Sequence, residues 1–148
     1  MEIREIKATE HIEEAWSLLS DHRDELATHR NLMVLKPDVE KYRALEDQGK
    51  LITIALYDGE TIVGYSVTML TGHLHYSDLS LAYNDVLYVH PQYRKGSWGV
   101  KLIKMTEQVA KERGMQLILF HGKEHTLFSN LMPRLGYQVQ DIVFSKEL

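Results

Sequence analysis

The chain has 148 residues, no cysteine and a formal net charge of −4, which excludes disulfides, thiolate zinc sites and a cysteine nucleophile. The negative charge also argues against a nucleic-acid partner, because proteins that bind nucleic-acid phosphates normally carry a basic face. Hydrophobic residues make up 44% of the chain and charged residues 26%, which is typical of a globular protein, and we expect one domain over residues 1–148.

Two further classes of sequence signal are missing. No apolar run reaches the roughly 18 residues that a membrane helix needs. The first residues, MEIREIKATEHIEE, lack a basic segment followed by an apolar one, so no signal peptide is predicted. We therefore expect a cytoplasmic protein without a membrane partner.

The N-terminal part is predicted to form one strand and two helices. Residues 2–7 alternate between polar and apolar side chains, which indicates a strand. Thr9 precedes apolar residues at near-helical spacing, namely Ile12, Trp16, Leu19 and Leu26. A second helix is predicted between Asp38, a good N-cap residue, and Gly49, a typical helix stop.

Three strands are predicted in the middle of the chain. Residues 51–70 predict a β-hairpin, since two runs of β-branched and aromatic residues flank the turn dipeptide Asp58-Gly59. Residues 81–89 predict the next strand. If its pleat is regular, one face carries Tyr83, Asp85, Leu87 and Val89.

The last part of the chain alternates between helix and strand. An apolar stripe at helical spacing predicts a long helix over residues 97–114. The nearly all-apolar residues 115–121 predict a central buried strand. A short helix over 125–136 and a final strand over 137–148 follow. The predicted order is β-α-α-β-β-β-α-β-α-β, a mixed α/β (α+β) domain.

The stretch RKGSWG, which begins at Arg94, lies where a strand becomes a helix. A helix N-terminus presents unpaired N–H groups and the positive end of the helix dipole. Gly96 and Ser97 leave this end open to an anion, Gly99 allows close contact, and Arg94 and Lys95 add positive charge. Taken alone, the stretch fits a phosphate site and an ordinary glycine-containing turn with solvated basic residues equally well.

The segment LYVHPQYRKGSWGVKLI resembles the central motif of the GNAT superfamily of N-acetyltransferases. In that motif an apolar-x-Val run and Pro-x-Tyr-Arg lead into Arg-x-x-Gly-x-Gly/Ala at the start of a long helix; here the first glycine is Ser97. LFSNLMPRLGYQV resembles the family's last helix with its Leu-Gly-Phe/Tyr ending, and YDGETIVGYSV resembles its paired strands. The resemblance covers most of the chain from Leu51 onward, and its details look most like small GNAT-type proteins of bacteriophages and prophages.

The resemblance implies a GNAT fold, with a central mixed, twisted sheet of about six to seven strands and flanking helices. It also implies an N-acetyltransferase that uses acetyl-CoA in a cleft where two parallel strands splay apart. Loop N–H groups would bind the pyrophosphate, and a strand N–H would polarise the acetyl carbonyl. The implied cofactor contacts are Leu87, Tyr88, Val89, Arg94, Lys95, Gly96, Ser97, Trp98, Gly99, Val100 and His125.

The catalytic acid and base are less well defined. Asp85 is the candidate base for the acceptor amine; alternatively it ties down a neighbouring loop, since a carboxylate in an apolar strand needs a partner in either case. Many relatives use a tyrosine as general acid at the position that is Met132 here, and methionine cannot donate a proton. Tyr83, His121 and Tyr137 are the other candidates for proton transfer.

The resemblance also implies that the acceptor is a primary amine of a protein, a peptide or a small molecule. Acidic residues near residue 25 either attract an amine or form a solvated helix face. His73 and His75 are spaced as metal ligands often are, but the sequence places no acidic third ligand, and no metal is predicted. A homodimer is compatible with the sequence. The alternative function is a non-catalytic acyl-CoA-binding module with a regulatory or assembly role.

Overall fold

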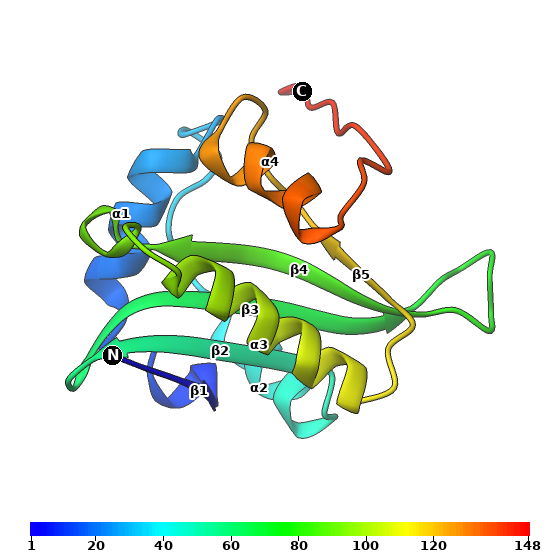
Figure 1. The fold of residues 1–148 in the computed structure, drawn as a ribbon, viewed down its shortest axis with the longest axis horizontal. Coiled ribbons are helices and arrows are strands. Elements are labelled where there is room, and N and C mark those ends of the chain that lie inside the picture. Colours follow the sequence, from blue (N-terminus) through cyan, green and yellow to red (C-terminus); the bar gives the residue numbers. More distant parts are fainter.

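A computed structural model describes all 148 residues, which form a single five-stranded sheet (Figure 1). The strands are β1 (Glu2–Ile6), β2 (Leu51–Asp58), β3 (Thr61–Gly72), β4 (Ser80–Val89) and β5 (Leu117–Phe120). They lie side by side in sequence order, antiparallel from β1 to β4 and parallel between β4 and β5.

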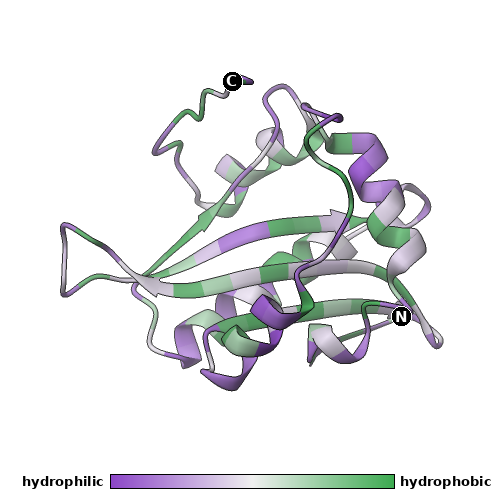
Figure 2. Cartoon of the chain, turned by 180° about the vertical axis from the view of Figure 1, so that it is seen from behind, coloured by the Kyte–Doolittle hydropathy of each residue, from purple (hydrophilic) through white to green (hydrophobic).

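Helices cover both faces of the sheet (Figures 1 and 2). α3 (Trp98–Glu112) packs on one face, and α1 (Trp16–Leu26) and α2 (Val39–Asp47) pack on the other. Short 3₁₀ turns are η1 (Ala8–Glu10), η2 (Pro91–Tyr93) and η3 (Met132–Leu135), and α4 (Leu127–Leu131) precedes the last of them. None of the helices combines the length and the hydrophobicity that a membrane crossing requires.

Each face of the sheet buries its own apolar core, because side chains alternate between the two faces of a strand. The core under α3 consists of Ile52, Ile54, Leu56, Val63, Leu70, Ala82, Val89, Leu102, Val109 and Ala110. The core under α1 and α2 consists of Leu18, Leu51, Ala55, Tyr57, Ile62, Tyr65, Val67 and Tyr88. Figure 2 shows the strands as largely hydrophobic, with a hydrophilic band that interrupts β4.

The prediction of six to seven strands is wrong, because the segment expected as the last strand, 137–148, forms neither helix nor strand. Its apolar side chains Val139, Ile142, Val143 and Phe144 are exposed. Three of them are consecutive, so a regular strand could not bury all three on one face. No neighbouring strand pairs with the segment, and a strand without a hydrogen-bonded partner is not stable.

The pleat of β4 is also irregular, where the prediction assumed a regular one. Val67 pairs with Val86 and Thr68 pairs with Asn84, so Asp85 has no partner on β3. Such a β-bulge adds one residue to a strand and reverses the faces of the residues beyond it.

The four residues predicted to share one face of β4 therefore lie on opposite faces. Leu87 and Val89 pack in the core under α3. Tyr83 is paired with Met69, which packs under α1 and α2, and Asp85 lines a cavity under α2. Asp85 thus stays on the face of Tyr83, which α1 and α2 cover, and the bulge turns Leu87 and Val89 to the face that α3 covers.

A buried polar network holds β4 next to the bulge. The Asn84 amide nitrogen lies 2.9 Å from both Ser66 Oγ and Thr68 Oγ1, and 3.1 Å from the Val67 carbonyl oxygen. The Thr106 hydroxyl of α3 lies 3.0 Å from Ser66 Oγ. Because buried polar groups are stable only when they are hydrogen-bonded, this network specifies how β3, β4 and α3 meet.

Candidate active site

The site begins where β4 and β5 diverge. Their pairing ends at Asn84 and Phe120, so the rest of β4 has β3 on one side and no strand on the other. The His90 N–H donates to the Val63 carbonyl on β3 at 2.8 Å. Peptide groups in a strand alternate in direction, and those of Leu87 and Val89 therefore face the open side. The predicted divergence of two parallel strands is present here.

The loop after β4 leads directly into the N-terminus of α3. Ser97 is the N-cap residue and makes no side-chain cap bond, and the Ser97 carbonyl accepts the first helical hydrogen bond, from Lys101. The N–H groups of the first turn thus have no intrahelical partner, and no acidic residue lies in that turn. Gly96 has a φ of 86°, and a Cβ built on Gly96 or Gly99 would meet no atom within 4 Å. The helix end is open to an anion.

Arg94 of this loop is held by two partners. Its Nη2 donates to Glu25 Oε2 of α1 at 2.7 Å, and its Nε donates to the Val89 carbonyl at 2.7 Å. The Arg94 guanidinium lowers the pKa of Glu25. The sequence suggested that Arg94 adds free positive charge, but Glu25 compensates that charge in the structure.

The other basic residues of the predicted cluster differ in how they are engaged. Lys104 pairs with Glu107 at 3.2 Å, and the Lys101 ammonium lies 4.1 Å from the centre of the Trp98 ring. Lys95 makes no ion pair. Lys95, Lys101 and the helix N-terminus therefore supply the positive charge that no carboxylate compensates.

An aromatic cluster connects α1 to β4 beside the loop. The Tyr88 hydroxyl donates to Glu25 Oε2 at 3.0 Å, and the His22 ring stacks on Tyr88 with centroids 4.6 Å apart. His22 Nδ1 lies 2.6 Å from the Tyr65 hydroxyl oxygen. Burial, together with Glu25, raises the pKa of Tyr88 to about 12, and burial lowers the pKa of His22. No sequence signal indicated that His22 and Tyr65 belong here, and the sequence placed Glu25 near an amine or on a solvated helix face and not beside Arg94.

Asp85 lines a cavity of about 170 Å³ under α2. Its carboxylate makes no ion pair and no hydrogen bond, so no loop is tied to it. The other lining residues are Asp38, Lys41, Tyr42, Leu45, Leu51, Val67 and Met69. Burial raises the pKa of Tyr42, and the nearby Asp85 charge adds to this effect.

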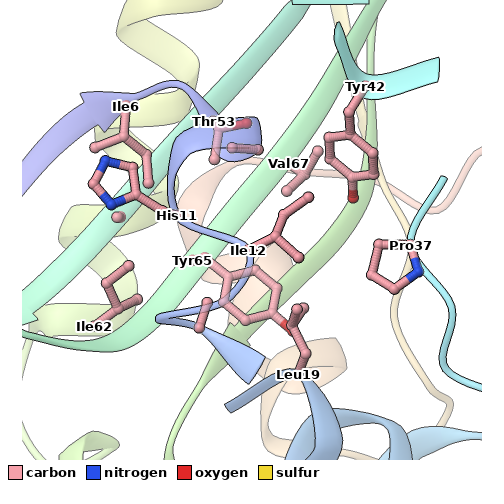
Figure 3. A pocket seen from close by; sticks show the side chains of 13 residues that line it. Ile6, His11, Ile12, Leu19, Pro37, Tyr42, Thr53, Ile62, Tyr65 and Val67 are labelled. Carbon is pink, nitrogen blue, oxygen red and sulfur yellow. The ribbon is translucent and has the colours of Figure 1, made fainter. Parts of the chain in front are cut away.

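Figure 3 shows a second cavity, whose volume is about 60 Å³. Tyr42 and Val67 line both cavities. The remaining lining residues are Ile6, Ala8, His11, Ile12, Ala15, Leu19, Pro37, Thr53, Ala55, Ile62 and Tyr65. Thr53 is buried, and its hydroxyl makes no hydrogen bond. This second cavity is therefore mostly apolar, and its lining also includes the polar groups of His11, Tyr42, Tyr65 and the unpaired Thr53 hydroxyl.

The remaining candidates for proton transfer are separated. Tyr83 and His121 contact each other edge to face, with ring centroids 4.6 Å apart at the end of β5. The Tyr137 hydroxyl donates to Glu107 of α3 at 2.7 Å, and burial raises the pKa of Tyr137. Met132 is buried. Of the tyrosine and histidine candidates, Tyr83 and His121 are the pair beside the opening between β4 and β5.

The histidines outside this region have few contacts. His125, at a φ of 59°, projects from the loop after β5, and its ring lies 3.5 Å from Glu124. The rings of His73 and His75 lie 6.1 Å apart in the β3–β4 loop, and no third metal-ligating residue joins them.

Comparisons with known proteins show the family and the fold of the chain. The model of the acetyltransferase (GNAT) family matches residues 10–137. No protein of curated function matches the sequence. An aminoglycoside acetyltransferase from an uncultured soil metagenomic sample superposes with a TM-score of 0.76 at 16% identity, covering 99% of this chain and 97% of that chain.

Two other solved structures show the same fold. Ribosomal-protein-alanine N-acetyltransferase from Brucella melitensis biovar Abortus 2308 has a TM-score of 0.73 at 14% identity, with 100% of both chains covered. The aminoglycoside N-acetyltransferase AAC(6')-Iy, solved in complex with CoA, has a TM-score of 0.70 at 13% identity, with 99% of both chains covered.

Proposed function

Since the chain belongs to the acetyltransferase (GNAT) family, we propose that it moves the acetyl group of acetyl-CoA directly to a primary amine of a protein, a peptide or a small molecule. The observation that carries the proposal is the open edge of β4 leading into the unpaired N–H groups at the start of α3. We also propose that the protein is similar to those of phages and prophages, that it is located in the cytoplasm and that it forms a homodimer.

The residues at the opening fit acetyl-CoA. The open space around Gly96 and Gly99 lets a pyrophosphate approach the loop N–H groups, and Lys95 adds positive charge. The outward peptide groups of Leu87 and Val89 suit the amides of pantetheine. When bound, acetyl-CoA supplies a thioester carbonyl that is activated for attack by an amine. A β4 N–H directed at that carbonyl oxygen would stabilise the charge that develops there.

The proton steps are assigned to residues around the bulge. Asp85 accepts the proton that the acceptor ammonium must lose before its nitrogen can attack, because its carboxylate has no competing partner. The Tyr83–His121 pair is positioned to return a proton to the sulfur as the carbon–sulfur bond breaks. Met132 occupies the position of the tyrosine that relatives use for this step.

Calorimetric titration with acetyl-CoA tests the cofactor assignment. We expect the wild type to bind and Ser97→Glu to lose binding, because a carboxylate at the helix N-cap would repel the pyrophosphate. Ser77→Glu is the matched control, since Ser77 lies in the exposed β3–β4 loop and should leave binding unchanged. Binding retained by Ser97→Glu would mean that the phosphate site lies elsewhere.

Asp85→Asn tests the base. The variant should bind acetyl-CoA as tightly as the wild type does. If Asp85 takes the proton, the rate of CoA release in the presence of an amine at neutral pH should fall by about 10²–10⁴-fold. Stopped assays of CoA release across pH 6 to 9 measure this. Equal rates at every pH would assign Asp85 a structural role.

The second candidate is a module that binds acyl-CoA without catalysis, and the buried Met132 at the usual acid position favours it. A wild type that binds acetyl-CoA but releases no CoA with amines of varied size and charge would support this function over the first.

A further inference from the structure

We propose that the acceptor is a primary amine on a short aliphatic chain. Its ammonium group would bind beside Asp85, and its chain would enter the apolar cavity behind Tyr42. This inference rests on the proposed acetyl transfer, and it specifies the substrate class of the same site. It follows from two adjoining cavities of opposite character.

The cavity that contains Asp85, called here the acidic cavity, suits a cation. Asp38 and Asp85 line it against a single ammonium group, that of Lys41. One carboxylate oxygen of Asp38 already accepts the Lys41 backbone N–H at 3.0 Å, whereas the carboxylate of Asp85 has no partner. Asp85 is exposed, so its carboxylate is accessible from solvent and free to pair with the ammonium group of an entering ligand.

The neighbouring apolar cavity suits a hydrocarbon chain. Ten of its 13 lining residues are hydrophobic. Its volume of about 60 Å³ is well below the roughly 150 Å³ of a protein cavity that binds benzene. A chain of a few carbons therefore fits the apolar cavity, and an aromatic ring or a sugar does not.

Thr53 adds one polar contact inside the apolar cavity. The residue is 5% exposed, and its hydroxyl has no hydrogen-bond partner. A buried hydroxyl without a partner is unfavourable, and a ligand that supplies one removes the penalty. An amine that ends in a hydroxyl group should therefore bind better than one that ends in a methyl group.

Tyr42 and Val67 separate the two cavities and line both. Figure 3 shows the Tyr42 side chain projecting from α2 into the apolar cavity, near Val67 and Pro37. One ligand can thus place its charged end beside Asp85 and its chain beside Ile12 and Thr53. The acceptor chain would then run under α1 and α2, away from the phosphate loop.

A homologous series of straight-chain primary amines, from ethylamine to octylamine, tests the proposal. Their dissociation constants are measured by calorimetry on the full chain saturated with CoA. We expect affinity to rise about fourfold for each methylene that becomes buried and to stop rising once the cavity is full. An alcohol of equal length should bind at least tenfold more weakly to the wild type, and Asp85→Asn should remove that difference.

Two variants with matched controls locate the chain. Ala55→Val adds two carbon atoms to the wall of the apolar cavity, so amine affinity should stop rising at a shorter chain length than in the wild type. Ala44→Val, on the exposed side of α2, should leave that chain length unchanged. Thr53→Val should abolish the preference for 4-amino-1-butanol over butylamine, and Thr61→Val, outside both cavities, should keep it. Circular dichroism of each variant checks that it is folded.

The outcomes separate this inference from the proposed function. If acetyl-CoA binds but amine affinity does not depend on chain length, the substrate class is wrong and acetyl transfer stands. The same holds if a polar amine such as glucosamine binds best and Ala55→Val leaves its affinity unchanged. If acetyl-CoA does not bind at all, the proposed function is wrong, whatever the amines do.

Discussion

Glu25 is the residue that connects three parts of the site. Its carboxylate accepts hydrogen bonds from Arg94 at 2.7 Å and from Tyr88 at 3.0 Å. Arg94 begins the phosphate loop, Tyr88 lies on the open strand, and Glu25 itself belongs to α1. A single side chain therefore aligns the helix that covers the acceptor face with the loop and the strand of the cofactor opening.

The Glu25→Gln variant should make stability less dependent on pH. Arg94 lowers the pKa of Glu25 below its ordinary value of 4.5, so the pair stabilises the native state fully above that value. The stabilisation is lost as the pH falls through the lowered pKa. Because both side chains are more than one-third exposed, we expect under about 1 kcal/mol at pH 7.

Urea unfolding at pH 7 and pH 3 measures this difference between the wild type and Glu25→Gln. Glu13→Gln, an exposed glutamate without an ion pair, is the control and should show no such change. If Glu25→Gln changed the free energy of unfolding by the same amount at both pH values, Glu25 would stabilise the protein through packing and not through its charge.

Among the elements, β4 determines the geometry of the site. Its bulge turns Leu87 and Val89 under α3, while Asp85 stays with Tyr83 on the face toward α2. The end of its pairing with β5 exposes one edge to a ligand. The same strand therefore presents a carboxylate on one face of the sheet and free peptide groups along its edge.

Gly64→Ala should disturb this strand. A Cβ on Gly64 would lie 3.0 Å from the Tyr88 carbonyl oxygen and 3.1 Å from Val89 Cγ2, so β3 and β4 would have to separate. We expect a loss of about 2 kcal/mol in the free energy of unfolding and weaker acetyl-CoA binding, because the displaced residues lie on the open edge. Chemical unfolding and calorimetry measure the two effects.

Gly72→Ala, at the other end of β3, is the matched control for this change. Its nearest neighbour would be the Leu79 carbonyl oxygen at 4.0 Å, an ordinary contact. If Gly64→Ala were as stable as Gly72→Ala and bound acetyl-CoA equally well, β4 would be able to shift without consequence for the site.

At the scale of the whole molecule, the proposed cofactor site and the proposed acceptor site lie in different parts of the sheet. The opening between β4 and β5 and the N-terminus of α3 suit the cofactor, and the cavities under α1 and α2 suit the acceptor. The segment 137–148 takes part in neither. Its apolar side chains are exposed, and its one bond to the α1–α2 loop joins His29 and Ser145 at 2.9 Å.

Deletion of residues 141–148 should therefore change the free energy of unfolding by no more than about 0.5 kcal/mol. Acetyl-CoA binding should be unchanged, because the one hydrogen bond from residues 141–148 to a distant part of the chain joins Ser145 to His29, outside the opening. Urea unfolding of the shortened chain tests this expectation. A loss above about 2 kcal/mol would show that the segment is packed in solution, for example along the outer edge of β5.

Local sequence patterns predicted much of the fold and the cofactor half of the candidate site. The turn at Asp58-Gly59 joins β2 and β3 as expected, because a tight hairpin depends on the conformations of its own residues. The anion site at the start of α3 was visible in RKGSWG for the same reason, since a helix N-terminus carries its N–H groups wherever it lies. That an anion binds there stays a prediction, whereas the family to which the chain belongs is shown by the matching family model.

The acceptor half could not be predicted in the same way. Glu25 was expected on a solvated helix face or near an amine, yet it binds Arg94, 69 residues further along the chain. The bulge at Asp85 depends on how β3 pairs with β4, and a shift of one residue reverses every face beyond it. In the sequence Thr53 is an ordinary strand threonine, and only the structure shows that its hydroxyl is buried without a hydrogen-bond partner.

The sequence by itself thus determined the order of the elements up to α4, the hairpin and the open N-terminus of α3, because each depends on residues that are neighbours in the chain. Only the tertiary structure decided the direction of Asp85, the partner of Arg94, the two adjoining cavities and the absence of a last strand. These features arise from burial and from pairing between distant segments. Whether such a feature is stable depends on the residues that surround it in space, and these are not its neighbours in the chain.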